Sequence, residues 1–528
     1  MTLPPLVRRL EAAGIGLFGG AAVAWLVGDA NYVALGAAAL FTLFVVLLTR
    51  AITPAPARQD VYLLVLLALT LRYAVAVIVH DGSLVVGRGG FITGDDAAYA
   101  DFSRILAQVY RGETVTSDYG GYLNLLGTFV YLETAIFLLV GPNVVVVELL
   151  NAALGACLVA LTCDLGRRLF DDARADLLAG ALVAFYPSLV LWTSLNLKDS
   201  LALFLISTVL WLIVIFNRTL VVWLVPAMYV PLLLMASLRF YVFVGLAIVI
   251  PIGVLVASAR RSVVQRIGTA ALALALSALL TVVQSAGNEA LSASLLAHLE
   301  SERAAMAVGA RTGFGTAVVL VERGATYVVP SSPENPVPPG RTPGVVIVQP
   351  DARIVIGSPL PGQNTIPVLP GDVIVVAGAG TRPTPAPQPR QLPVTVTSGE
   401  LQLADASADS VVLRTLGYLP VGLAFALFAP FPGAGRRAQD LLPIPEMLVW
   451  YVVLVATVVA LWHSRSRWRS LAPLVLFVGG TLLIFALAEG NVGTLYRHRA
   501  MVIPFVIVLA APALIRLLDR DSEARASR

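Results

Sequence analysis

Residues 32–49 read YVALGAAALFTLFVVLLT, a continuous apolar run without a charged side chain. As a helix this run rises about 27 Å, at about 1.5 Å per residue. A bilayer has a hydrocarbon core of about 30 Å, so the run is long enough to cross it. Similar runs recur along the 528-residue chain, which is 58% hydrophobic and only 13% charged. Soluble domains carry about 25% charged residues, so these values predict a polytopic, all-α membrane protein.

Twelve apolar stretches are predicted to span the membrane, and two more are ambiguous. Arg8 and Arg9 place the N-terminus in the cytoplasm, because Lys and Arg accumulate on that side. No cleavage site follows the first apolar run, so we expect it to remain as an uncleaved span. The predicted spans are residues 12–28, 32–49, 60–80, 144–164, 177–194, 199–216, 220–237, 240–258, 267–284, 446–463, 471–488 and 500–517.

The two ambiguous stretches, 122–141 and 413–430, are assigned by charge. If 122–141 crossed the membrane, Arg167 and Arg168 would lie outside, against the usual bias. We therefore expect 122–141 to lie along the interface, and the same reasoning applies to 413–430. The prediction is about 12 transmembrane helices in the cell membrane, with both termini cytoplasmic.

Three long outer segments follow from this topology, at 81–143, 286–410 and 411–445. Sixteen of the 33 prolines lie between Pro330 and Pro393, which predicts a partly extended insertion. Short β-rich runs suggest a small, partly β domain there. The expected organisation is therefore an N-terminal membrane domain (1–285), an extracytoplasmic insertion (286–410) and a C-terminal membrane region (411–528). The β-rich runs are Val318–Val321, Val345–Val348, Ile354–Ile356 and Val373–Val376.

The first outer segment carries an acidic motif, Gly94-Asp95-Asp96-Ala97-Ala98-Tyr99. The apolar spacing that follows it predicts an amphipathic helix in the headgroup plane. Asp95 can be the N-cap of this helix or a general base that takes a proton from an acceptor hydroxyl. The pair can instead hold Mg²⁺ or Mn²⁺ against a substrate phosphate, so a divalent cation is an open alternative. The apolar positions are Phe102, Ile105, Leu106 and Val109.

Basic residues gather at three later outer junctions. Lys198, beside Asp199, can form a local ion pair or contact a phosphate. Arg239 lies outside, against the charge bias, and either snorkels or has a functional role. Another basic cluster precedes the last span, where two arginines can bind a phosphate bidentately or anchor to headgroups. This cluster contains Arg497, His498 and Arg499, with Glu489 just before it.

The order of these features resembles the GT-C class of membrane glycosyltransferases. The resemblance is greatest to the branch that uses dolichyl- or polyprenyl-phosphate sugars, which includes protein mannosyltransferases and aminoarabinose transferases. It covers roughly 60–260 and 411–517. Two spans precede the usual first one, and the insertion 286–410 has no counterpart. The segments that carry the resemblance are Gly94–Tyr99, Tyr122–Gly141, Leu150–Gly155, Gly166–Phe170, Ala184–Ser188 and Tyr496–Arg499.

This resemblance implies transfer of a sugar from a polyprenyl-phosphate-linked donor to a hydroxyl of a lipid, glycan or protein acceptor, with inversion. Asp95 or Asp96 would be the base, with Asp95 slightly preferred. The leaving phosphate would be stabilised by Lys198, Arg239, Arg497 and Arg499, with Tyr99, His498 and Glu489 nearby. Membrane lipids would be the remaining partners.

Other functions stay open. A polysaccharide polymerase or ligase would need the arginines but not Asp95 and Asp96. A transporter usually shows inverted repeats and midplane charges, neither of which is evident. A structural or sensory protein would use 286–410 as a binding domain. Nucleic-acid binding is not indicated, because no basic stripe is interleaved with aromatic residues.

Overall fold

The computed structural model describes residues 5–113, 115, 127–219, 221–257, 262–285, 419–431, 443–488 and 492–526, together with short strands between 318 and 401. The chain forms two compact units. The first consists of Met1–Gln284, Leu448–Val478 and Ala500–Arg528. The second consists of Ser285–Met447 and Gly479–Arg499.

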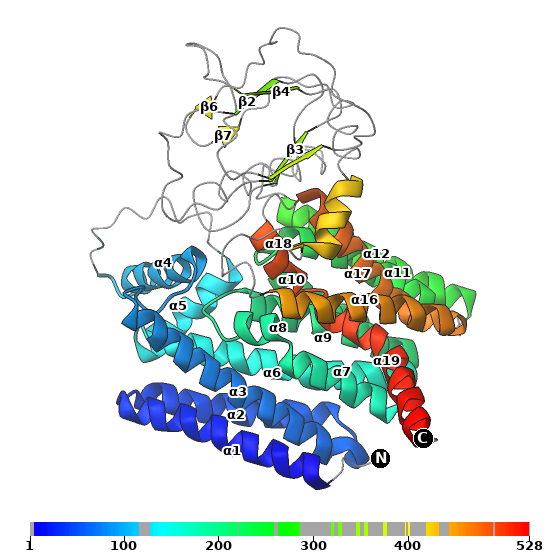
Figure 1. Ribbon diagram of the computed structural model, residues 1–528, viewed down its shortest axis with the longest axis horizontal. Coiled ribbons are helices and arrows are strands. Elements are labelled where there is room, and N and C mark those ends of the chain that lie inside the picture. The colour runs from blue at the N-terminus through cyan, green and yellow to red at the C-terminus, as the bar shows by residue number, and fades with distance from the viewer. Residues whose placement is uncertain are drawn as a thin grey trace. The chain divides into compact units, whose positions relative to one another are not determined.

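The first unit is built from helices (Figure 1). It contains α1 (Pro5–Gly28), α2 (Tyr32–Ile52), α3 (Arg58–Val85), α4 (Gly94–Tyr110), α5 (Thr128–Val140), α6 (Val144–Phe170), α7 (Ala173–Phe185), α8 (Pro187–Trp192), α9 (Asp199–Thr219), α10 (Leu224–Ala236), α11 (Phe240–Ala257), nearly all of α12 (Val263–Ser285), most of α16 (Ile444–His463), the first half of α17 (Trp468–Ala488) and α19 (Ile503–Ala526).

The second unit combines short strands with helical segments. Strands β1, β3 and β5 form a parallel sheet, β2 and β4 pair in parallel, and β6 and β7 pair antiparallel. Its helices include Leu419–Phe428 and α18 (Val492–Arg499). The strands are β1 (Val318–Leu320), β2 (Thr326–Val329), β3 (Val345–Val348), β4 (Arg353–Ile356), β5 (Val373–Val376), β6 (Val396–Thr397) and β7 (Glu400–Leu401).

Among the described residues, 8 helices are long and apolar enough to cross a membrane, and the bent pair α18–α19 makes up to 9. A multi-pass membrane protein is therefore confirmed in outline. All eight helices fall on stretches predicted to span. The other predicted spans differ in form: 177–194 is broken into α7 and α8, 220–237 and 240–258 form the shorter helices α10 and α11, and 500–517 lies in α19.

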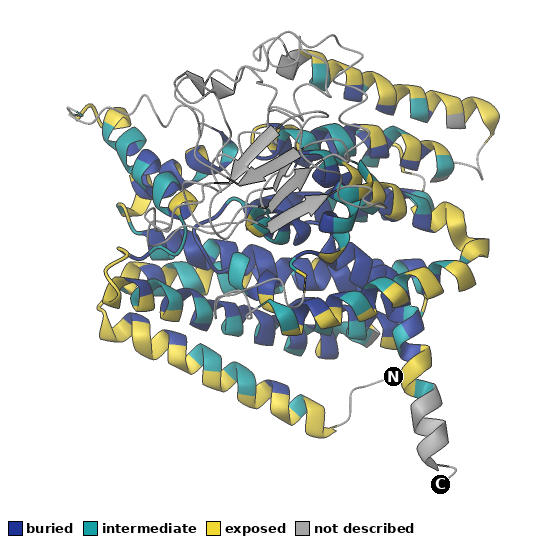
Figure 2. Cartoon of the chain, turned by 45° about the horizontal axis from the view of Figure 1, so that its top comes forward, coloured by how far each residue is buried: buried dark blue, intermediate teal, exposed yellow. Residues whose placement is uncertain are grey.

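Helix α6 is the centre of the first unit. In its most apolar window 89% of the residues are buried, compared with 17% in α1 and in α2. Helices α2, α3, α7 and α9 pack against it, and Figure 2 shows the buried residues concentrated in the middle of the helix bundle. Helices α1 and α2 carry exposed side chains such as Leu17, Trp25 and Leu43. Large exposed apolar surface of this kind is what a helix presents to lipid.

The chain leaves and rejoins the helix bundle at the same end around α4 and α5. At the end of α3, His80 Nδ1 lies 3.1 Å from Glu148 Oε2 near the start of α6. Just before α6, Asn143 Nδ2 donates to Asn31 Oδ1 at 2.8 Å. The segment between α3 and α6 therefore does not cross from one end to the other. Both α4 and α5 belong to the end formed by Asn31, His80 and Asn143, which we call the polar end.

Ion pairs and hydrogen bonds join the helix termini at the opposite end. Arg8 Nη2 lies 2.8 Å from Asp60 Oδ1, which joins the starts of α1 and α3. Arg174 lies 2.7 Å from Asp519, joining α7 to α19. Arg467 Nη1 donates to the carbonyl of Phe170 at 3.0 Å. We call this the basic end, because arginines predominate at these termini.

A fully buried arginine stabilises the break between α7 and α8. Pro187 has no N–H, so the carbonyl of Val183 loses its helical donor. Arg72, 0% exposed on α3, supplies Nη2 to Val183 O at 3.2 Å and Nη1 to Ala184 O at 3.0 Å. Its Nε donates to Thr193 Oγ1 at 2.9 Å. A charge inside an apolar run is costly, and here it is balanced by four hydrogen bonds, one of them to Ala68 O within α3.

Replacing Gly155 by Ala should destabilise this arrangement. A Cβ there would lie 2.6 Å from Thr193 Oγ1 and 2.9 Å from Arg72 Nε. We expect G155A to lose roughly 1–3 kcal/mol of unfolding free energy, the usual range for overpacking. Thermal unfolding in detergent micelles measures the change. The control is Gly36→Ala in α2, where a Cβ meets no atom within 4 Å, and equal stability of the two variants would contradict the expectation.

Candidate functional site

The two adjacent aspartates at the start of α4 have different environments. Thr93 is the N-cap and accepts from Asp96 N at 3.2 Å. The Asp96 carboxylate, 1% exposed, accepts from the backbone N–H groups of Ile92 and Thr93 at 2.9 and 3.0 Å. It also accepts from Ala97 N at 2.9 Å. Asp95, by contrast, is exposed.

The capping role considered for Asp95 is therefore filled by Thr93 and Asp96, and that interpretation of Asp95 was wrong. The reason is that the helix begins two residues earlier than an N-cap at Asp95 would require, since its N-cap is Thr93. A capping box places its acidic residue at the third helical position, where it can reach back to the N-cap N–H. Asp96 satisfies this spacing from Thr93, whereas Asp95 is one residue too early.

A buried glutamate connects α5 to the acidic motif. Glu133, 0% exposed, accepts from Ser103 Oγ at 2.9 Å and from Asn196 Nδ2 at 2.8 Å. Asn196 also donates to the backbone carbonyl of Asp96 at 3.1 Å. The segment that contains Asn196 is held in turn by Asn151, which donates to Leu195 O and Leu197 O at 2.7 and 3.0 Å. The start of α4 is thus tied to the turn before α9.

Lys198 lies in that same turn. Within residues 193–200 every residue except Lys198 is buried. Its Nζ lies 5.7 Å from the centroid of the Tyr99 ring, within the range of a cation–π contact. Lys198 is also the only lysine in the chain, since every other basic residue among the 36 is arginine. Position 198 is therefore the one place where this chain uses lysine and not arginine, a signal that was not used in the prediction from sequence.

Arg239 lies between α10 and α11 and is paired with a carboxylate. Its Nη2 lies 2.6 Å from Asp199 Oδ1, and its Nη1 donates to the Tyr241 hydroxyl at 3.1 Å. Burial alone lowers the pKa of Arg239, but nearby Tyr241 and Asp199 outweigh it and raise the pKa above its ordinary value. The guanidinium therefore stays charged, with its charge balanced by Asp199.

The structure thus brings together several predicted site residues within the first unit. Asp95 and Asp96 begin α4, Tyr99 lies one turn later beneath Lys198, and Asp199 joins Lys198 to Arg239. All of these belong to the polar end, because the turn before α9 is bound to the start of α4.

The second unit contains the other predicted cations. Arg497, His498 and Arg499 are all at most 9% exposed in α18. Arg499 Nε donates to Ala426 O at 3.1 Å, and its Nη2 donates to Ala429 O. Its guanidinium therefore holds the end of the helix Leu419–Phe428. The His498 ring lies 5.9 Å from Phe485, and Glu489 lies outside the described residues.

The residues present offer limited support for a divalent cation. Within the part of the chain that the structure describes, no group of three His, Cys, Asp or Glu side chains could hold a metal ion. Both oxygens of Asp96 already accept from backbone amides, so the adjacent pair does not offer two open carboxylates. Binding of Mg²⁺ or Mn²⁺ stays a prediction.

Burial raises the pKa of Glu133 from its ordinary 4.5 to about 7, although hydrogen bonds from Ser103 and Asn196 oppose the shift. Between these pH values the folded protein keeps a proton that the unfolded chain releases. The protonated Glu133 carboxyl group therefore stabilises the folded state fully below about pH 4.5, and this contribution is lost as the pH rises through 7. The difference of two to three pKa units corresponds to roughly 3 kcal/mol.

We expect Glu133→Gln to remove most of this pH dependence, because the amide cannot ionise. Thermal unfolding between pH 5 and 8 measures it, and the variant should be more stable than the parent at pH 8. Glu113→Gln makes the same change at an exposed position and should follow the parent. Parallel pH profiles for the parent protein and the Glu133 variant would show that Glu133 ionises normally.

No family model matches this chain, and no curated protein matches it either.

Proposed function

We propose that this protein transfers a sugar from a polyprenyl-phosphate-linked donor to an acceptor hydroxyl, with Asp95 as general base and Lys198 stabilising the lipid phosphate. The observation that carries the proposal is the connection between an exposed carboxylate and the only lysine. Asp95 begins α4, Tyr99 lies one turn later under Lys198, and Asn196 ties the lysine's turn to Asp96 O.

The chemistry needs both groups at once. Asp95 takes the proton from the acceptor hydroxyl, and the oxygen attacks the anomeric carbon as the bond to phosphate oxygen breaks. The polyprenyl phosphate leaves with the bonding electron pair, and the configuration inverts. Lys198 meets the negative charge that develops on the phosphate as a compact point charge. Arg239, predicted as a further phosphate ligand, is already paired with Asp199, which favours a role in positioning the turn that carries Lys198.

Arg497 and Arg499 stay predictions as phosphate ligands. Arg499 already donates to the backbone carbonyls that end the helix Leu419–Phe428, which favours a supporting role. Arg497 is the better candidate of the two.

The proposed orientation follows from the charge at the two ends of the first unit. Arginines collect on the cytoplasmic side of membrane proteins. The basic end, with Arg8, Arg174 and Arg467, would then be cytoplasmic. Asp95 and Lys198 at the polar end would face the extracytoplasmic side of the cell membrane, with both termini inside. Twelve spans and a GT-C architecture are part of this proposal, with α10, α11 and the broken pair α7–α8 as shorter crossings.

Because Lys198 is the only lysine, one reagent can test the proposal. In proteoliposomes, an amine-selective acylating reagent should modify Lys198 and the N-terminal amine, and mass spectrometry measures each. Polyprenyl phosphate should protect Lys198 while the N-terminal amine reacts unchanged, which serves as the internal control. Equal labelling with and without the lipid phosphate would remove Lys198 from the phosphate site.

Activity supplies the second arm of the test. Transfer of labelled sugar from a panel of polyprenyl-phosphate sugars is measured for the parent protein and for Lys198→Met. We expect the methionine variant to lose at least tenfold in rate, since it keeps the length of the side chain but not its charge. Transfer at the parent rate in this variant would favour the alternative reading, an arginine-dependent polymerase or ligase.

A further inference from the structure

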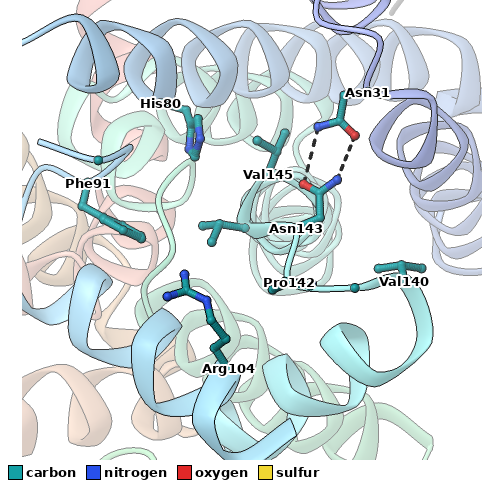
Figure 3. A pocket seen from close by; sticks show the side chains of 11 residues that line it. Asn31, His80, Phe91, Arg104, Val140, Pro142, Asn143 and Val145 are labelled. Atoms are coloured by element: carbon teal, nitrogen blue, oxygen red, sulfur yellow. Dashed lines mark hydrogen bonds between the residues drawn. The ribbon is translucent and has the colours of Figure 1, made fainter. Parts of the chain in front are cut away.

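A cavity of about 410 Å³ opens at the polar end of the first unit, apart from Asp95 and Lys198. Five separate segments supply its polar and aromatic lining: the turns before α2 and α6, the end of α3, the loop before α4, and α4 itself. These residues are Asn31, His80, Phe91, Arg104 and Asn143 (Figure 3). Cavities of about 300–1,000 Å³ are the usual size for small-molecule sites.

Each polar side chain of this cavity is fixed by a partner. Asn31 and Asn143 face each other through reciprocal amide contacts of 2.8 and 3.5 Å. His80 Nδ1 lies 3.1 Å from Glu148, and Arg104 Nη1 lies 2.9 Å from Asp101. Figure 3 shows His80, Phe91 and Arg104 directed toward one space, with the amide pair beside it. The amide pair and His80 are therefore held in place before any ligand binds, whereas the exposed pair with Asp101 constrains Arg104 less.

The loop that carries Phe91 has a conformation that requires glycine. Gly90 has φ +94°, and a Cβ there would lie 2.6 Å from Cε1 of His80. Gly87 and Gly89 also have positive φ values, of +76° and +66°. Glycine adopts such angles without steric cost. The loop can thus close over the imidazole and bring Phe91 to the cavity.

The charged groups around the cavity argue against an anionic ligand, because acidic side chains outnumber basic ones. Arg104 is compensated by Asp101 and His80 by Glu148, and Asp29 and Asp81 also lie near His80. An anion would therefore gain little from Arg104, or from His80, which carries a charge only when it is protonated. The remaining N–H groups of the amides and of Arg104, the amide and carboxylate oxygens, and the ring of Phe91 offer donors, acceptors and an apolar face together. A sugar presents the matching mixture of hydroxyls and C–H surface.

We propose that this cavity binds a neutral sugar unit of a glycan acceptor, which rests on the proposed function for its place in the reaction. Arg104 follows Asp95 on the same helix by nine residues, a rise of about 14 Å. The unit bound beside Arg104 is thus not the one that reacts. Nine residues are also about two and a half turns, so Asp95 and Arg104 leave α4 on opposite sides. An oligosaccharide with an inner unit in the cavity and its reacting hydroxyl at Asp95 therefore passes around α4 as well as along it. The turn before α2 completes the cavity through Asn31, which gives the first two helices a part in acceptor binding.

Binding of neutral oligosaccharides tests this directly. The full chain in lipid nanodiscs, without donor, is titrated with oligosaccharides of glucose, mannose, galactose or arabinose and, separately, with inorganic phosphate. Calorimetry measures the affinities. We expect an oligosaccharide of this panel to bind and the corresponding monosaccharide to bind more weakly. Arg104→Ala and Asn143→Ala should each weaken binding at least tenfold, whereas Gln108→Ala, one turn further along α4, should bind like the parent protein.

Three results would overturn the proposal: no oligosaccharide of the panel binds, phosphate binds in their place, or the two lining variants bind like the parent. Gly90→Ala supplies an independent check, because it displaces His80 without removing a polar group, and it should also weaken binding. Thermal unfolding of each variant checks that it is folded. The two proposals fail separately, because binding of the oligosaccharide without any transfer by the parent protein would count against the reaction alone.

Discussion

Asp95→Asn is expected to lower the rate of sugar transfer by roughly 10²–10⁴-fold, the usual contribution of a general base, while thermal stability stays unchanged. The physical reason is the environment of the side chain. Asp95 is exposed at the start of α4, and the cap of that helix is made by its neighbours Thr93 and Asp96. Removal of its charge therefore removes a proton acceptor and leaves the helix cap in place.

Asp96→Asn is the matched variant and should behave in the opposite way. Its carboxylate accepts from three backbone N–H groups, and an amide offers a single acceptor oxygen. Loss of a helix cap costs about 0.5–2 kcal/mol. We expect a lower unfolding temperature and a transfer rate that falls by less than in Asp95→Asn. Transfer of labelled sugar in proteoliposomes and thermal unfolding, measured on both variants, check the pair.

The reverse pattern, with a larger loss of activity in Asp96→Asn at unchanged stability, would assign the base to Asp96. Full activity in both variants would remove the carboxylates from the chemistry. Asp95→Glu keeps the carboxylate but moves it one methylene further from the backbone. This variant should transfer sugar faster than Asp95→Asn, because a longer carboxylate at an exposed site can still reach a hydroxyl.

The second large effect is expected at the buried ion pair of Asp199 and Arg239. The side chains are only 2% and 8% exposed, and the charged atoms lie 2.6 Å apart. Removal of one partner leaves an uncompensated charge in a site with little water. Such a change costs about 3–5 kcal/mol, whereas replacement of both partners by apolar residues is often neutral.

We therefore expect Asp199→Leu and Arg239→Met each to unfold at much lower temperature or denaturant concentration, and the double variant to recover most of the loss. Unfolding in detergent micelles gives the four values of the double-mutant cycle. Asp519→Ala breaks the exposed pair with Arg174, whose side chains are both 43% exposed, and should leave the unfolding temperature almost unchanged. Additive losses in the double variant would show that the two charges do not stabilise each other.

The long apolar runs made most of the fold predictable, and the exceptions have local causes. Helical spans follow from hydropathy because every backbone group must be bonded within the membrane. The run 177–194 passes the same test, yet Pro187 divides it into α7 and α8. The carbonyls freed there are satisfied by Arg72, which is more than a hundred residues away in sequence. No local pattern reveals such a partner.

The candidate site was predictable in part. Asp95, Lys198 and Arg239 stand out in sequence as charges at span ends. The distinct roles of Asp95 and Asp96 depend on the N-cap at Thr93, which was not predicted. Glu133 and Asn196 act through tertiary hydrogen bonds, although Glu133, as an acidic residue within an apolar run, gave a signal that was overlooked.

Arg72 also sets an order for the insertion of this chain into the bilayer. Its partner Thr193 follows it by 121 residues. At about 5–20 residues per second, a ribosome needs roughly 6–24 s to synthesise that distance. During this interval the third helix holds a guanidinium in the bilayer without its partners on α7 and α8, at a cost of about 2.5–3.5 kcal/mol on insertion scales. The translocation machinery or the first two helices must therefore retain it until the later segment arrives.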